Sequence, residues 1–250
     1  MQLFGKKIPF SVSLLFWCLI WELAGWMGLS SIFPPISKIL VAATTVFTTE
    51  KFIKAMEISL RTFALGMSLS LVVGIGLGTL MARVRIVREI LGMWVNIFVS
   101  APISALVPIL MGILGIGEAT VVATVFLFAV FIIILDTQVG ISMADRSLIE
   151  MGKSLGASRY QMFTKILVLS ALPEILAGIR LGVIRGVKGV VIGQLLISII
   201  GVGELFEFYS MNFMMEEFWS LVIVVFAFAF VLSEGIAFFE RRVEYYAGNR

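Results

Sequence analysis

The residues of this sequence that could do chemistry are few, and most are polar side chains inside long apolar stretches. Asp136, Arg185 and Lys188 place charges in such stretches, and Gln194 adds a neutral amide a few residues further on. A charge at the centre of a lipid bilayer costs roughly 2.5–3.5 kcal/mol, so each must pair, reach an interface or face a wet cavity. Arg185, Lys188 and Gln194 share one stretch. They are candidate residues of a solute pathway, and simple pairing between helices is the alternative.

Catalytic and metal chemistry find little support in the sequence. It contains no histidine, and its single cysteine, Cys18, lies within an apolar run. His-dependent catalysis and most zinc sites are therefore excluded, and no disulfide framework can form within the chain. A Walker A pattern (Gly, four residues, Gly-Lys-Ser/Thr) is also absent from the sequence, so the chain is not expected to hydrolyse ATP. We predict no catalytic residue, no metal site and no cofactor bound by this chain.

Two short glycine-rich motifs need an interpretation. Residues 115–118 (Gly-Ile-Gly-Glu) and 201–204 (Gly-Val-Gly-Glu) are similar to the glycine-rich aspartate motif of intramembrane aspartyl proteases. Both carry glutamate, and no second acid within a span is placed to form a dyad. The favoured interpretation is a helix C-terminus closed by glycine in the left-handed conformation. An intramembrane enzyme remains the less favoured alternative.

The elements that must position these residues are long apolar helices. Hydrophobic residues make up 60% of the 250 positions and charged residues 14%, against about 45–50% and about 25% in soluble domains. The apolar residues come in runs of about 20, which is long enough to cross a hydrocarbon core of roughly 30 Å. The sequence therefore predicts an all-α membrane protein, a single transmembrane domain over residues 1–250. The predicted spans are about 9–28, 60–82, 90–114, 119–141, 176–200 and 218–239.

The basic residues predict how this domain is oriented. Cytoplasmic loops carry an excess of Lys and Arg, and an N-terminus inside places twelve of the nineteen basic residues on the cytoplasmic side, against four outside. Both termini and the long polar interruption at residues 142–175 are then cytoplasmic, in a multi-pass protein of the inner or plasma membrane. No basic stripe with interleaved aromatics occurs, so lipid and protein partners are expected, and nucleic acid is not. The twelve are Lys6, Lys7, Arg83, Arg85, Arg88, Arg146, Lys153, Arg159, Lys165, Arg241, Arg242 and Arg250.

Glycines recur at every fourth position in two of the predicted spans. The fifth contains Gly178, Gly182 and Gly186, and the second contains Gly74 and Gly78. Small residues at this spacing let another helix backbone approach closely. The pattern indicates tight packing in a bundle, or a fifth span that moves against its neighbours as a gate.

The polar interruption at residues 142–175 is predicted to form a helix–turn–helix. Asp145 or Ser147 can cap a first helix, residues 156–158 (Gly-Ala-Ser) form a tight turn, and Ser158 can cap a second helix. Pro173 follows at the point where the chain is expected to re-enter the bilayer. A loop of this length is typically functional, so we interpret it as a docking element.

This segment is similar to the cytoplasmic signature of permease subunits of binding-protein-dependent ABC importers. That signature runs Glu-Ala-Ala, three residues, Gly, nine residues, and Ile-x-Leu-Pro. Glu150, Gly156 and Ile166 match it at the required spacings, and Pro173 keeps the second proline common in the family. Residues 33–36 (Phe-Pro-Pro-Ile) also resemble the segment after the family's first span. The departures from the signature are Met151, Gly152, Val168 and Leu169.

The resemblance implies a type I ABC importer permease fold, with six helices and a cytoplasmic coupling helix–turn–helix between the fourth and fifth. It implies a cytosolic ABC ATPase that carries ATP and magnesium, an extracytoplasmic solute-binding protein, and a second permease copy. The most similar group serves nitrate, sulfonate, taurine and related small solutes, and it carries an acidic residue at the position of Gln194. A channel or scaffold that docks another cytosolic protein is the alternative. The implied ATPase-coupling residues are Glu150, Gly152, Leu155, Gly156, Ala157, Ser158, Ile166 and Pro173.

Overall fold

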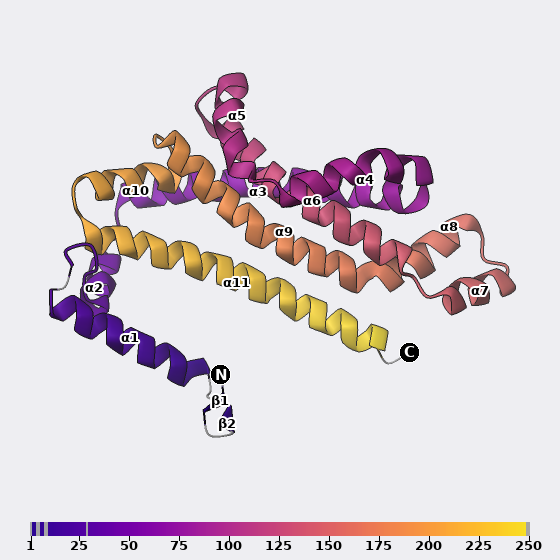
Figure 1. The fold of residues 1–250 in the computed structure, drawn as a ribbon, viewed down its shortest axis with the longest axis horizontal. Helices are drawn as coiled ribbons and strands as arrows, with labels where there is room; N and C mark the ends of the chain where they lie inside the picture. Colours follow the sequence, from indigo (N-terminus) through magenta and orange to yellow (C-terminus); the bar gives the residue numbers. More distant parts are fainter. Residues whose placement is uncertain (1, 4–5, 8–9, 29, 249–250) are drawn as a thin grey trace.

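The computed structural model describes residues 2–3, 6–7, 10–28 and 30–248, with side chains described from residue 12 to residue 242 except residue 29. Four long helices lie side by side along one direction (Figure 1). Each is long and apolar enough to cross a membrane. The predicted all-α membrane class is therefore confirmed. The four are α3 (Glu50–Arg83), α6 (Glu118–Ser142), α9 (Val168–Ile197) and α11 (Met215–Gly248).

Shorter elements surround this bundle. The N-terminal segment contains a pair of two-residue antiparallel strands, β1 (Gln2–Leu3) and β2 (Lys6–Lys7). Helix α1 (Phe10–Trp26) has 17 residues, the lower limit of about 17 for a membrane span. It corresponds to the first predicted span, about 9–28. Residue 9 of that span lies outside the described residues, and so does Arg250, one of the predicted cytoplasmic basic residues. The others are α2 (Ile36–Val46), α4 (Arg85–Ser100), η1 (Ile103–Leu106), α5 (Val107–Leu114), α7 (Arg146–Ser154), α8 (Arg159–Gln161), η2 (Met162–Leu167) and α10 (Gly201–Met211).

The third predicted span, at about 90–114, is not one straight helix. The chain bends by 98° between Arg85–Ser100 and Ile103–Leu114, and α5 projects away from the bundle (Figure 1). Ala101 is extended (φ −72°, ψ 149°) because Pro102 follows, and a residue that precedes proline disfavours the helical conformation. Counted with this bent pair as one, the described chain has up to five spanning helices besides the shorter α1.

The glycine motif at residues 201–204 does not end a helix. Helix α9 ends at Ile197, and the residue that follows it, Ser198, adopts the left-handed conformation (φ 58°). Gly201 instead opens α10, a helix that the sequence did not predict. The interpretation is confirmed for the other motif, because Gly115 closes α5 with φ 82°.

Helix α6 lies at the centre of the bundle, between α3 and α9. A Cβ atom added to Gly78 would lie 2.7 Å from the backbone oxygen of Ile134, and one on Gly178 would lie 2.6 Å from Cβ of Asp136. Glycine therefore lets both neighbouring helices approach α6 closely. The packing interpretation of the glycine spacing is confirmed at these two contacts, while the gating interpretation stays a prediction.

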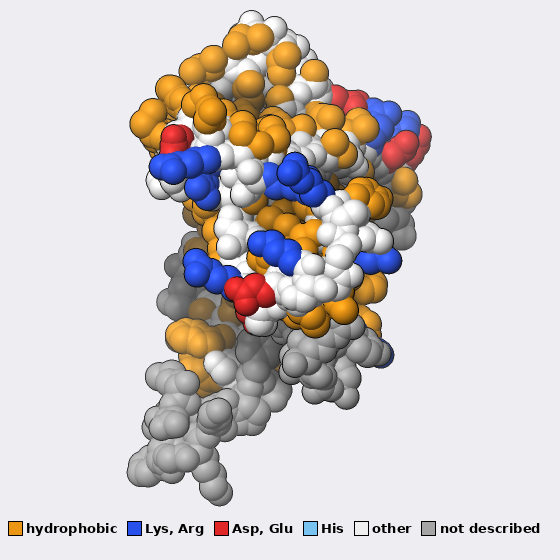
Figure 2. All heavy atoms as spheres, turned by 90° about the vertical axis from the view of Figure 1, so that its right-hand side faces the viewer, with side chains coloured by type: hydrophobic (Ala, Val, Ile, Leu, Met, Phe, Trp, Pro, Cys, Tyr) orange, Lys and Arg blue, Asp and Glu red, His pale blue; other side chains and the backbone are white. Residues whose placement is uncertain are grey.

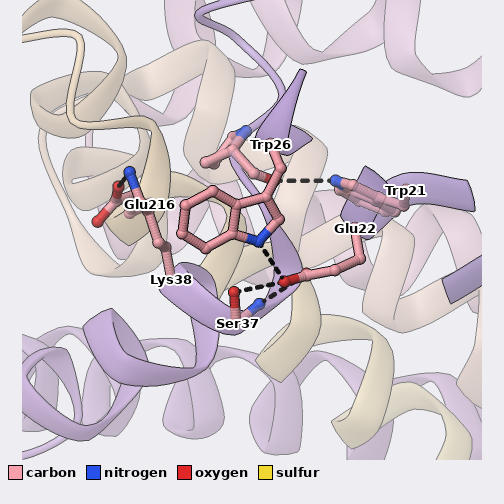
Figure 3. Close-up of polar contacts among 7 residues, drawn as sticks. Trp21, Glu22, Trp26, Ser37, Lys38 and Glu216 are labelled. Atoms are coloured by element: carbon pink, nitrogen blue, oxygen red, sulfur yellow. Dashed lines mark hydrogen bonds and ion pairs between the residues drawn. The ribbon is translucent and has the colours of Figure 1, made fainter. Parts of the chain in front are cut away.

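A polar and aromatic cluster holds the connection between α1 and α2 (Figure 3). The carboxylate of Glu22 accepts hydrogen bonds from Trp26 Nε1 (2.8 Å) and from the backbone N of Ser37 (3.0 Å). Trp21 Nε1 donates to the carbonyl of Pro34 at 3.0 Å, and the Trp21 ring meets that of Trp219 edge-on at 4.8 Å. The cluster therefore ties α1 to the first turns of α11.

Candidate functional site

The predicted helix–turn–helix is present at one end of the bundle, where α7 meets an elbow at residues 155–158. Asp145 is the residue that caps α7, and its carboxylate accepts from the backbone N of Ser147 at 2.8 Å. At the other end of α7, Ala157 N donates to Gly152 O at 2.9 Å, and Gly156 adopts φ 71°. This is the hydrogen-bond pattern of a helix closed by a left-handed residue. Gly156 therefore makes the sharp elbow possible.

Ser158 begins the second helix through a reciprocal capping box. Its Oγ accepts from Gln161 N at 3.2 Å, and the Gln161 side chain accepts from Ser158 N at 2.9 Å. The helix then runs through α8, the π-helical η2 and α9 as one rod of 39 residues, Arg159–Ile197. Pro173, which we expected near the point where the chain re-enters the bilayer, lies inside α9 and does not interrupt the helix. One missing N–H is compensated there by packing of the neighbouring Ala171 and Ile175 against α6.

A close contact at Gly152 fixes the angle between the two arms of the elbow. Gly152 is buried against η2, and a Cβ atom at this position would lie 2.9 Å from Cε of Met162 and nearer still to Cδ1 of Ile166. Gly152 is one of the departures from the family signature, and Ile166 is one of its matches. The structure thus brings these two predicted residues together, while Pro173 lies further along the rod.

The outer surface of the elbow exposes apolar side chains to solvent. Leu155 is 79% exposed, Tyr160 76% and Met151 51%. Glu150, Gly156 and Ser158 are also exposed, and Ala157 is half-buried. Figure 2 looks onto this end of the molecule, where Lys and Arg side chains are prominent. Exposed apolar side chains rimmed by charges are typical of a protein–protein contact surface.

The three predicted pathway residues lie in different surroundings. Lys188 is exposed on α9, Arg185 is half-buried, and Gln194 is fully buried. Gln194 Oε1 accepts from Ser59 Oγ at 2.9 Å and from Val202 N at 3.2 Å. The Gln194 side chain therefore links α9, α3 and α10 within the chain. The assignment of all three residues to a solute pathway stays a prediction.

Glycines of α10 complete this link, which the sequence interpretation missed. A Cβ atom on Gly201 would lie 2.6 Å from Cδ of Gln194, and one on Gly203 would lie 2.7 Å from its Cβ. Gly203 would also approach the backbone carbonyl of Gln194. We call Ser59, Gln194 and residues 201–203 the outer knot. Its signal in the sequence is a polar amide, Gln194, seven residues before a Gly-x-Gly sequence.

An ion pair joins α9 to α11 nearer the elbow end of the bundle. Arg180 Nη1 lies 3.1 Å from Glu240 Oε2, and the Glu240 side chain is only 14% exposed. Sequence alone could not pair these residues, because 60 positions separate them.

A bundle of long apolar helices with an exposed elbow at one end is the fold of ABC importer permeases. The fold is similar to that of the MetNI methionine ABC transporter in an inward-facing conformation, with a TM-score of 0.66 and 18% identity over 77% of this chain and 96% of that chain.

The family follows from the sequence match. Residues 70–245 match the model of the binding-protein-dependent transport system inner membrane component, and the chain belongs to that family. A probable ABC transporter permease protein of Brucella melitensis is 29% identical over 72% of this chain and 75% of its own length. The taurine transport system permease protein of Escherichia coli is 26% identical over 92% of this chain and 86% of its own. The chain is a multi-pass inner-membrane protein and the permease subunit of a binding-protein-dependent ABC importer.

Proposed function

We propose that this chain forms, with a second copy of itself, the path by which a small solute enters the cell, an anion of the nitrate, sulfonate or taurine type or a related metabolite. A cytosolic ABC ATPase that binds ATP and magnesium docks on the elbow, and an extracytoplasmic binding protein delivers the solute to the opposite end. In this arrangement both termini are cytoplasmic. The similarity to a taurine permease over 92% of the chain supports the solute class.

The charges on α9 support an anionic solute. Lys188 is exposed between the buried residues Val187 and Gly189, and neither Lys188 nor Arg185 forms an ion pair within the part of the chain described here. Cations at this depth are costly against lipid. A water-filled path shared with a second copy would remove that cost, and its positive lining would favour anions.

The single observation that carries the coupling proposal is the exposed elbow. Leu155 is 79% exposed at its tip, so its side chain contributes nothing to the core of this chain. Glu150 and Ser158 flank it on the solvent side. A cleft in the ATPase that receives Leu155 would bury this apolar side chain, and burial of a leucine is worth about 1.5–3 kcal/mol.

Replacement of Leu155 by aspartate tests this docking directly. The L155D variant is expected to insert normally and to lose co-purification with the ATPase, together with solute-stimulated ATP hydrolysis. Phe213, equally exposed at 79% in the turn between α10 and α11, is the matched control, and F213D should keep the ATPase. Retention of the ATPase by L155D would refute docking at the elbow. A wild-type chain that conducts solute without any ATPase would favour the channel alternative.

A further inference from the structure

A groove beside the elbow shares only Tyr160 with the exposed apolar surface that we propose for docking of the ATPase. It lies between the end of α3 and the start of the long rod, and it has a volume of about 550 Å³ open to solvent. Its walls are apolar at Leu80, Val84 and Phe163, with two arginines and one tyrosine at its rim. The six lining residues are Leu80, Arg83, Val84, Arg159, Tyr160 and Phe163.

The groove carries uncompensated positive charge. Arg83 and Arg159 are both exposed, and neither forms an ion pair with any side chain from residue 12 to 28 or from 30 to 242. The guanidinium of Arg83 lies over the ring of Phe163 with 3.7 Å between its Cζ and the ring centroid. Stacking on the ring fixes the plane of the guanidinium and leaves its N–H groups free to bind an anion.

The position of the groove at the end of a membrane-spanning helix indicates which class of anion it binds. Arg83 is the last residue of α3, one of the four membrane-spanning helices. Helix α4 begins directly after Val84 and exposes Ile86 (68%) and Ile90 (60%). An occupant therefore meets two arginines, a tyrosine and the apolar side chains of the groove, and the exposed isoleucines of α4 follow directly in the sequence. A free inorganic anion would leave the apolar walls without a partner.

We propose that this groove binds the headgroup phosphate of an anionic phospholipid of the inner leaflet, with its acyl chains along the exposed face of α4. Arg83 and Arg159 bind the phosphate oxygens, and Tyr160 donates a hydrogen bond to the headgroup. Because Arg83 belongs to α3 and Arg159 to the first turn after the elbow, the lipid joins the membrane bundle to the elbow. The inference does not depend on the identity of the solute or of the ATPase.

The test measures lipid binding to the full-length chain in detergent by native mass spectrometry, with phosphatidylglycerol and phosphatidylcholine as probes. Each basic residue near a membrane surface is worth about 1 kcal/mol toward anionic lipid, so R83Q/R159Q should bind phosphatidylglycerol about thirtyfold more weakly. Phosphatidylcholine binding should not change. Arg88 is exposed, lies outside the groove and also forms no ion pair among the described side chains, so R88Q is the control and should weaken binding no more than the roughly fivefold expected of one basic residue near the membrane surface.

Three results would overturn the proposal. Equal binding of both lipids to the wild-type chain would show that charge plays no part. Displacement of phosphatidylglycerol by inorganic phosphate at millimolar concentration would assign the groove to a free anion. Normal lipid binding by R83Q/R159Q, with loss of the ATPase from the complex, would assign the groove to an acidic side chain of the protein partner. The single variant R159Q guards against misfolding, because Arg159 is exposed and forms no ion pair with the described side chains, and it should still weaken binding several-fold.

Discussion

Replacement of Gly203 by alanine is the sharpest test of the outer knot. The added Cβ would lie 2.7 Å from Cβ of Gln194 and also against the carbonyl group of the same residue. Backbone atoms cannot move aside as a side chain can, so α10 must shift, at a cost of about 1–3 kcal/mol for overpacking. The matched control is Gly76 in the middle of α3, where an added Cβ meets nothing within 4 Å. G76A should gain about 0.5–1 kcal/mol from the loss of glycine's backbone freedom.

Thermal unfolding of the purified chain in detergent, followed by tryptophan fluorescence, separates the two variants. At about 2–4 °C per kcal/mol for a chain of this size, G203A should melt at least roughly 3 °C below G76A. The combination with Gln194→Ala then identifies the clash. The nearest atoms to a Cβ on Gly201 belong to the Gln194 side chain, so Gln194→Ala should restore part of the Tm lost in Gly201→Ala. The nearest atoms to a Cβ on Gly203 belong to the Gln194 carbonyl group, so Gln194→Ala should not restore the Tm of G203A. Rescue of G203A by Gln194→Ala, or equal melting of G203A and G76A, would refute the reasoning.

Three other perturbations test the elbow and the rod. Gly152→Val should push η2 away from α7 at a cost of about 1–3 kcal/mol and abolish solute-stimulated ATP hydrolysis. Gly152→Ala should reduce this hydrolysis only partly, because the added Cβ meets the flexible ends of the Met162 and Ile166 side chains. Ser158→Ala removes half of the capping box, and local hydrogen exchange at the elbow should speed up about fivefold for a loss of ~1 kcal/mol. Arg180→Ala leaves the largely buried Glu240 carboxylate without its ion-pair partner and should lower the free energy of unfolding by about 1–3 kcal/mol. Glu240→Gln, which still accepts a hydrogen bond, should lower Tm less, and an equal loss in the two variants would contradict the pairing.

Periodicity and spacing were sufficient for the elements that obey local rules. The long apolar runs predicted α3, α6, α9 and α11 because a bilayer requires an uninterrupted helix of about 20 apolar residues. The elbow was equally accessible, because Asp145, Gly156 and Ser158 act through contacts within a few positions along the chain. The bend between α4 and α5 was also predictable from the sequence, because Pro102 disfavours the helical conformation at Ala101.

Elements that depend on distant contacts could not be predicted in this way. Gln194 meets Ser59 across 135 positions of sequence, and Arg180 meets Glu240 across 60. Helix α10 was missed because Gly201 and Gly203 are poor helix formers whose value lies in the space they leave for Gln194. Pro173 lies inside α9, where packing of the neighbouring Ala171 and Ile175 against α6 outweighs the local preference of proline to interrupt a helix.

The continuity of the helix through Pro173 has a mechanical consequence for the proposed function. The rod Arg159–Ile197 contains 39 residues, which at about 1.5 Å each gives a length of about 58 Å. Its first turn is capped by Ser158 at the elbow, and Gln194 in its last turn is fixed in the outer knot. A break at Pro173 would have let the elbow move while the membrane part of the helix stayed still. Because the helix is unbroken, displacement of the elbow by an ATPase acts along the same rod that carries Arg185 and Lys188, and it reaches α3 and α10 through the hydrogen bonds of Gln194.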